Sequence, residues 1–156
     1  MTAATETAPH YRDADEIAAL VSAFTDATLP RAAWTHAAHL TVALWYLLRH
    51  DAPEATNLIR AGILRYNAAH GIETTPTTGY HETLTLFWIR CVREHLAEHA
   101  NDATLLALAN GLVARYDKNT PLKYYTRERL FSPEARAGWV EPDIAQEAEG
   151  VICYNA

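Results

Sequence analysis

Apolar residues recur every three or four positions along most of the chain, a spacing typical of amphipathic helices. Turn-forming residues interrupt the pattern at Leu29-Pro30-Arg31, at Asp51-Ala52-Pro53 and from Glu73 to Gly79. We predict helices over residues 13–28, 35–50, 53–69 and 81–99, a fifth from a cap at Asn101-Asp102 to about Tyr116, and a short sixth starting at Ser132-Pro133-Glu134. The segment 117–131 has no clear period.

The predicted second helix has apolar residues around nearly its whole circumference, which is typical of a central, buried helix. No run of residues alternates convincingly with the period of a strand. The pattern therefore predicts an all-α fold, a single-domain bundle of about five to six helices with short connections.

Size and charge limit the classes of protein. The chain has 156 residues, of which 49% are hydrophobic and 21% charged, and this fits one domain with a substantial core. We expect a flexible N-terminal tail at residues 1–12 and one helical domain over residues 13–156. The net charge of -6 argues against nucleic acid and acidic membranes as partners.

The sequence has no signal-peptide pattern and no apolar run of about 20 residues, so we expect a cytoplasmic protein without a membrane span. Its two cysteines, Cys91 and Cys153, do not form the pattern of a disulfide framework. The sequence is compatible with a homo-oligomer and does not determine the oligomeric state.

Topology brings three histidines to one end of the predicted bundle. Short connections make successive helices antiparallel, so the second and fourth helices run parallel. Their N-termini carry His36 and His39, one turn apart, and His81. The irregular segments 29–34, 70–80 and 117–131 meet at the same end, whereas the opposite end has only tight turns. We therefore expect the functional site at the histidine end.

These three histidines have the pattern of metal ligands. The N-termini of their helices disfavour protonation of His36 and His81, and the neutral imidazole is the form that binds metals. Three imidazoles with an open position suit catalytic zinc, and they also suit iron or copper. We predict one divalent metal ion bound by His36, His39 and His81. The alternative is that His36 and His81 cap their helices and His39 bonds a buried carbonyl.

Residues beside His81 are candidates for the chemistry. Glu82 lies about 100° around the helix axis from His81. It is a candidate for a fourth metal ligand, for a group that orients a metal-binding histidine, or for a general base. As a plain surface residue, Glu82 would only favour the helix dipole. Thr85 lies one turn after His81, where it could bond a substrate or the carbonyl one turn back. We assign a catalytic role to Glu82 and substrate binding to Tyr80 and Thr85.

A later segment combines tyrosines with arginines and a helix cap at Ser132; its site candidates are Tyr124, Tyr125, Arg127 and Arg136, and Arg129 belongs to the same cluster. Tyrosines offer hydroxyls and flat faces, and arginine can bind a carboxylate or phosphate through two hydrogen bonds. The segment predicts an anion-binding lid in which Tyr125 is catalytic and the other three candidates bind substrate. A packed surface turn is the alternative.

Three strings resemble landmarks of a group of small helical bacterial proteins without assigned function. They are Trp34-x-His36-x-x-His39-Leu40, Tyr80-His81-Glu82-Thr83-x-Thr85 and Leu130-x-Ser132-x-x-Ala135-Arg136-x-x-Trp139-x-x-Pro142-Asp143. The resemblance covers most of the chain and implies no activity. It does suggest that the three strings belong to one site.

Together these features predict a metal-dependent enzyme that acts on a small polar, anionic molecule by hydrolysis, hydration, elimination or isomerisation. An iron or copper oxygenase would use the same ligands. A metal-free module that binds a small molecule or a partner, and a metal-independent acid–base catalyst using His81 and Glu82, are the other hypotheses. The strings typical of serine hydrolases, phosphate loops and His-Glu-x-x-His metalloproteases do not occur.

Overall fold

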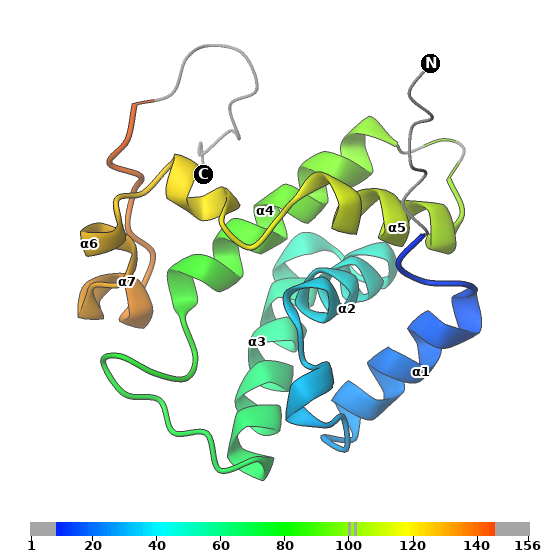
Figure 1. The fold of residues 1–156 in the computed structure, drawn as a ribbon, viewed down its shortest axis with the longest axis horizontal. Coiled ribbons are helices and arrows are strands. Elements are labelled where there is room, and N and C mark those ends of the chain that lie inside the picture. The colour runs from blue at the N-terminus through cyan, green and yellow to red at the C-terminus, as the bar shows by residue number, and fades with distance from the viewer. Residues whose placement is uncertain (1–8, 100, 102, 146–156) are drawn as a thin grey trace, which may run out of the picture.

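The computed structural model describes residues 9–99, 101 and 103–145, and every regular element within them is helical (Figure 1). The long helices are α1 Ala14–Thr25, α2 His36–Arg49, α3 Ala52–Ala69, α4 Glu82–Glu98 and α5 Leu105–Arg115. The shorter elements are the 3₁₀-helices η1 Arg31–Ala33 and η2 Thr120–Lys123, and the helices α6 Arg127–Leu130 and α7 Pro133–Ala137. The prediction of an all-α fold is confirmed.

Each long helix begins at a side chain that accepts a hydrogen bond from the backbone of its first turn. The caps are Asp13, Thr35, Asp51, His81 and Thr104, for α1 to α5 in order. Such caps satisfy N–H groups that have no partner within the helix. The local sequence therefore determines where each of these helices begins.

One expectation about the connections is corrected, and one segment without a clear period is found to contain short helices. Thr104 caps α5, so this helix does not begin directly at Asn101-Asp102, and Asp102 lies outside the described residues. Segment 117–131 contains η2 and α6, which are too short for an apolar period to reveal. The predicted start at Ser132 is confirmed, because its hydroxyl accepts a hydrogen bond from Ala135 at the beginning of α7.

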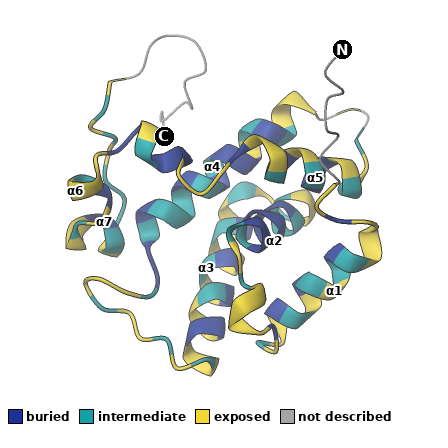
Figure 2. Cartoon of the chain, viewed as in Figure 1, coloured by how far each residue is buried: buried dark blue, intermediate teal, exposed yellow. Residues whose placement is uncertain are grey.

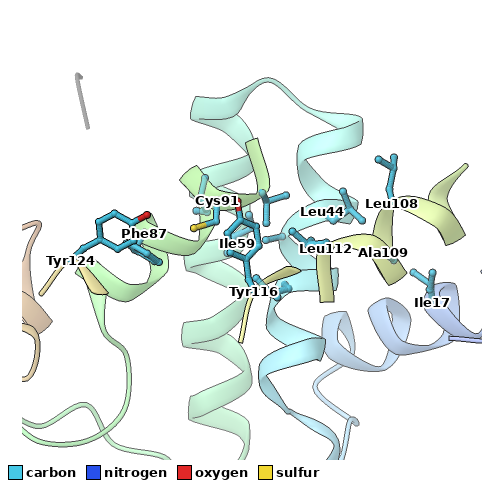
Figure 3. Close-up of a cluster of buried hydrophobic side chains, with 14 of the residues drawn as sticks. Ile17, Leu44, Ile59, Phe87, Cys91, Leu108, Ala109, Leu112, Tyr116 and Tyr124 are labelled. Atoms are coloured by element: carbon cyan, nitrogen blue, oxygen red, sulfur yellow. The ribbon is translucent and has the colours of Figure 1, made fainter. Parts of the chain in front are cut away.

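α2 lies at the centre of the bundle, as its apolar circumference predicts. It packs against α1, α3, α4 and α5, and Figure 2 shows its buried residues among these neighbours. A close-up shows Leu44 of α2 within the main core cluster, with Ile59 of α3, Phe87 of α4 and Leu112 of α5 (Figure 3). This packing fixes the first turn of α2 relative to the ends of its neighbours.

The expected flexible tail is in part fixed to the bundle. Tyr11 is 5% exposed, and its hydroxyl lies 2.7 Å from Thr41 Oγ1. Its backbone N–H donates to Asn110 Oδ1 at 2.8 Å, and Asn110 Nδ2 donates back to the Tyr11 carbonyl at 3.0 Å. Residues 1–8 of that expected tail lie outside the described residues, as does Cys153.

In the described part of the chain, no helix combines the length and apolar character needed to span a membrane.

Candidate functional site

A cavity of about 480 Å³ lies where α2 and α4 begin and α3 ends. His36 and His39 line it from α2, His81 from the cap of α4 and Asn67 from the last turns of α3. Residues of all three irregular segments also line it, namely Trp34, Ile72, Gly79, Tyr80 and Lys118. The three predicted histidines therefore share one cavity, at the end of the bundle that the antiparallel topology predicts.

The walls of the cavity are mainly apolar. The aliphatic part comes from three helices, as Val42 and Ala43 of α2, Ile59 and Ile63 of α3, and Leu84 and Ile89 of α4. Trp34 and Trp88 add aromatic surface. Walls of this kind with a few polar groups are typical of small-molecule sites, and the volume is within the usual range for them.

His36 and His39 each have one ring nitrogen bonded to a backbone carbonyl. Nε2 of His36 lies 3.0 Å from the carbonyl oxygen of Tyr116, and Nδ1 of His39 lies 2.7 Å from that of Thr35. A carbonyl oxygen only accepts hydrogen bonds, so these two nitrogens carry the protons. In the neutral rings, Nδ1 of His36 and Nε2 of His39 therefore hold lone pairs, and no hydrogen bond from the described residues occupies them.

The surroundings of His39 keep its imidazole neutral. The ring packs against Trp34, with ring centroids 3.7 Å apart. Burial, with a smaller contribution from neighbouring His36, lowers the pKa of His39 to about 4. His39 is therefore uncharged near neutral pH.

We expect His39 to make folding stability depend on pH. An unfolded imidazole titrates near pH 6.5, so between about pH 6.5 and about pH 4 the unfolded chain binds a proton that folded His39 does not. The free energy of unfolding should fall as the pH decreases through this window, by roughly 2 kcal/mol from this group.

Urea unfolding at about pH 7 and about pH 4.5, in wild type and His39→Phe, measures this contribution. Phenylalanine keeps a ring against Trp34 and cannot be protonated, while the Thr35 carbonyl still accepts the His39 backbone N–H at 3.0 Å. Wild type should lose more stability than the variant on acidification. Identical losses would contradict the assignment.

His81 is a structural histidine in this arrangement. It is 7% exposed, and its Nε2 lies 2.7 Å from the Leu130 carbonyl oxygen, to which it donates. Its Nδ1 accepts the Leu84 backbone N–H at 3.1 Å, as the N-cap of α4. Burial lowers the pKa of His81. Both ring nitrogens thus have protein partners, as the capping alternative predicted.

Glu82 is held by an arginine that sequence reasoning missed. Arg60 of α3 donates from Nη2 to Oε1 at 2.5 Å and from Nε to Oε2 at 3.1 Å. The Tyr80 hydroxyl donates to Oε2 at 3.1 Å. With its charge paired in this way, Glu82 holds α3 against the start of α4, and it is not among the residues that line the cavity. Its predicted catalytic role finds no support here.

Tyr80 and Thr85 do line the cavity, but their hydroxyls also have protein partners. Thr85 Oγ1 donates to the His81 carbonyl at 2.8 Å. This is the predicted alternative in which Thr85 bonds the backbone carbonyl one helical turn earlier. The Tyr80 hydroxyl is used by Glu82. Both oxygens keep the ability to accept a hydrogen bond from a ligand.

The predicted lid residues do not line the cavity. Tyr125 is fully buried, and its hydroxyl donates to the Val140 carbonyl at 2.8 Å. Tyr124 is buried against Phe87. Arg136 donates to the carbonyls of Pro76 and Gly79, so it fixes the loop before α4.

Arg127 is exposed on α6. The structure therefore corrects the expected placement of these four side chains at the histidines, and the packed-turn alternative describes them better.

Asn67 and Lys118 also line the cavity, and neither was predicted from the sequence. Asn67 follows Ile59 and Ile63 at intervals of four, so it is a polar residue in the apolar stripe of α3. That mismatch is the signal that could have identified it. Lys118 is exposed in a segment without a period, and no comparable signal marks it.

The described residues contain no group of three or more histidine, cysteine, aspartate or glutamate side chains placed to hold a metal ion. His36 and His39 each have a free nitrogen, but His81 would have to leave both the Leu130 carbonyl and the Leu84 N–H to join them. As placed, the donors do not fit a three-histidine centre, and such a centre stays a prediction from the sequence.

No protein-family model, curated protein or solved structure matches this chain. The resemblance to small helical bacterial proteins stays a prediction as well.

Proposed function

We propose that this protein binds a small organic molecule in the cavity between α2, α3 and α4, through apolar contacts and a few hydrogen bonds. The observation that carries the proposal is Asn67. This residue is 7% exposed and lines the cavity, yet no hydrogen bond from the described residues reaches its side-chain amide. The amide faces the cavity, so water or a ligand there must satisfy its hydrogen bonds.

The other polar groups support the same proposal. His36 and His39, each with one ring nitrogen that no described residue hydrogen-bonds, line the same apolar cavity as Tyr80 and Thr85. A ligand that fills the cavity would bury apolar surface and could pair with polar atoms of these residues. Few, convergent polar groups in an apolar pocket are typical of specific small-molecule binding.

Filling the cavity should abolish binding. Ile63 is half-buried and lines the cavity, whereas the next residue, Leu64, is 44% exposed. We expect Ile63→Trp to weaken every fragment that binds wild type by at least about tenfold, because the indole takes the ligand's space. Leu64→Trp makes the same chemical change on the outer face of α3 and should leave the affinities unchanged.

Ligand-observed NMR with a library of small aromatic and aliphatic fragments, run on all three proteins, measures this. Thermal unfolding confirms that both variants are folded. The proposal fails if no fragment binds wild type, or if Ile63→Trp binds the fragments as well as Leu64→Trp does.

A second candidate is the metal-dependent enzyme predicted from the sequence. One observation favours it, since His36 and His39 each donate a ring N–H to a backbone carbonyl, as metal-binding histidines commonly do. Plasma mass spectrometry of purified wild type beside His39→Phe tests it. Near-stoichiometric metal that the variant loses would support it, and no metal after reconstitution with zinc, iron and copper would overturn it.

A further inference from the structure

His36 and His39 both line the cavity, and each has one ring nitrogen without a hydrogen bond from the described residues. Because the Tyr116 and Thr35 carbonyls can only accept, they require the protons on Nε2 of His36 and Nδ1 of His39. The opposite tautomer of either ring would place a lone pair against a carbonyl lone pair. Nδ1 of His36 and Nε2 of His39 are therefore both acceptors in the neutral site.

An anion does not suit this pair of acceptors. A carboxylate or phosphate needs hydrogen-bond donors, and the imidazoles become donors at these atoms only when they are protonated. Burial of His39 opposes its protonation, and charging both rings would place two like charges one helical turn apart. Lys118 also lines the cavity, but the residue is exposed, so water and salt screen its charge.

A cation does not suit the site either. Among the residues that the structure describes, no aspartate or glutamate lines the cavity. The nearby carboxylate of Glu82 is already paired with Arg60. A buried ammonium group would therefore lack a counter-charge, and burying an unpaired charge is costly.

We infer that the ligand reaches His36 and His39 with two hydrogen-bond donors, hydroxyl or N–H groups, carried on an uncharged, ring-containing body. This inference rests on the proposed binding function and specifies its ligand class. The aromatic faces of Trp34 and Trp88 and the aliphatic wall would contact the ring. The Asn67 amide can pair with a further polar group on the same molecule.

A graded series of probes tests the inference. Resorcinol has two donors, 3-methoxyphenol one and 1,3-dimethoxybenzene none, on the same ring. We expect affinity to fall at each step, with at least about a tenfold loss from the first probe to the last, because a buried acceptor loses its partner each time. Benzoate and benzylamine should bind more weakly than resorcinol. Chemical-shift titrations of isotope-labelled wild type give the affinities and locate the binding site.

His39→Phe is the matched variant, because it removes one acceptor and keeps a ring beside Trp34. Resorcinol and 3-methoxyphenol should bind this variant alike, since only the acceptor of His36 remains. This also separates hydrogen bonding from the bulk of the added methyl group, because a steric effect would persist in the variant.

The outcomes separate the inference from the function on which it rests. If 1,3-dimethoxybenzene or benzoate binds wild type as tightly as resorcinol, or if library fragments bind and this series does not, the ligand class is wrong and the binding function stands. If neither the series nor the library binds, the binding function fails and the inference fails with it. An unchanged ratio of resorcinol to 3-methoxyphenol in His39→Phe would also overturn the inference.

Discussion

Replacing His81 with alanine is expected to lower the free energy of unfolding by about 3–4 kcal/mol. The imidazole is 7% exposed and makes two hydrogen bonds to backbone groups, one within α4 and one to the carbonyl of Leu130. Alanine would leave the Leu84 N–H and that carbonyl without their partner, and it would open a small cavity. Urea unfolding followed by circular dichroism measures the change.

Thr104→Ala is the matched control for this prediction. Thr104 caps α5 in the same way, with Oγ1 accepting the Ala107 N–H at 3.1 Å. It is exposed, and its side chain makes no second hydrogen bond to the rest of the described chain. We expect it to cost about 1 kcal/mol. His81→Asn should fall between the two, because asparagine can cap α4 but is too short to replace the bond to Leu130.

The result separates the structural role of His81 from the predicted metal-ligand role. A purely ligating histidine would leave the metal-free fold unchanged when it is replaced. If His81→Ala is no less stable than Thr104→Ala, the structural assignment is wrong. If that variant also loses bound metal, the three-histidine centre is favoured instead.

Local sequence signals predicted the helices and the end of the bundle where the histidines meet. Caps such as Thr35 and Asp51 and apolar spacing act over a few residues, so one sequence is enough to place the elements. Short connections then determine which ends lie together. The common location of His36, His39 and His81 followed from that topology alone, and the structure places all three at one cavity.

The roles of the side chains could not be predicted in the same way. Each role depends on partners that are distant in sequence: Glu82 is paired by Arg60, and His36 is oriented by the carbonyl of Tyr116. Arg136 was expected to bind an anion, but it donates to loop carbonyls about sixty residues earlier. No local pattern encodes such contacts. From residue type alone, Glu82 and Arg136 were therefore predicted to take part in catalysis or ligand binding, whereas in the fold their side chains hold neighbouring segments together.

Asn67 shows where a stricter interpretation of the pattern would have helped. A polar residue at a buried stripe position must find a partner in the fold or face a polar site. Asn67 is not titratable, so a search for acid–base or metal-binding side chains does not find it. Lys118 and the neutral state of His39 depend on the assembled cavity, and only the structure reveals them.

Gly79→Ala is expected to destabilise the protein by about 3 kcal/mol or more and to weaken fragment binding. Gly79 lines the cavity with φ of 80°, a conformation that residues with a side chain rarely adopt. A Cβ there would lie 2.5 Å from the Glu73 carbonyl oxygen and 2.8 Å from Thr74 Cα. Both are backbone atoms, so the loop would have to open to accept the methyl group.

This loop forms one wall of the cavity, and Arg136 fixes it by donating to the Gly79 carbonyl at 3.0 Å. Opening the loop should therefore move Ile72 and Tyr80 away from the ligand and weaken fragment binding along with stability. A loss of stability with unchanged fragment affinity would show that the loop does not shape the site.

Gly71→Ala separates backbone strain from crowding. Gly71 also has a positive φ, 66°, but an added Cβ would meet nothing within 4 Å. We expect this variant to lose only about 1 kcal/mol, from strain alone, and to keep its affinity for fragments. Urea unfolding and the fragment titrations, run on both variants, measure the difference. Equal losses of stability would mean that the close approach of Gly79 to Glu73 and Thr74 does not constrain this wall of the cavity.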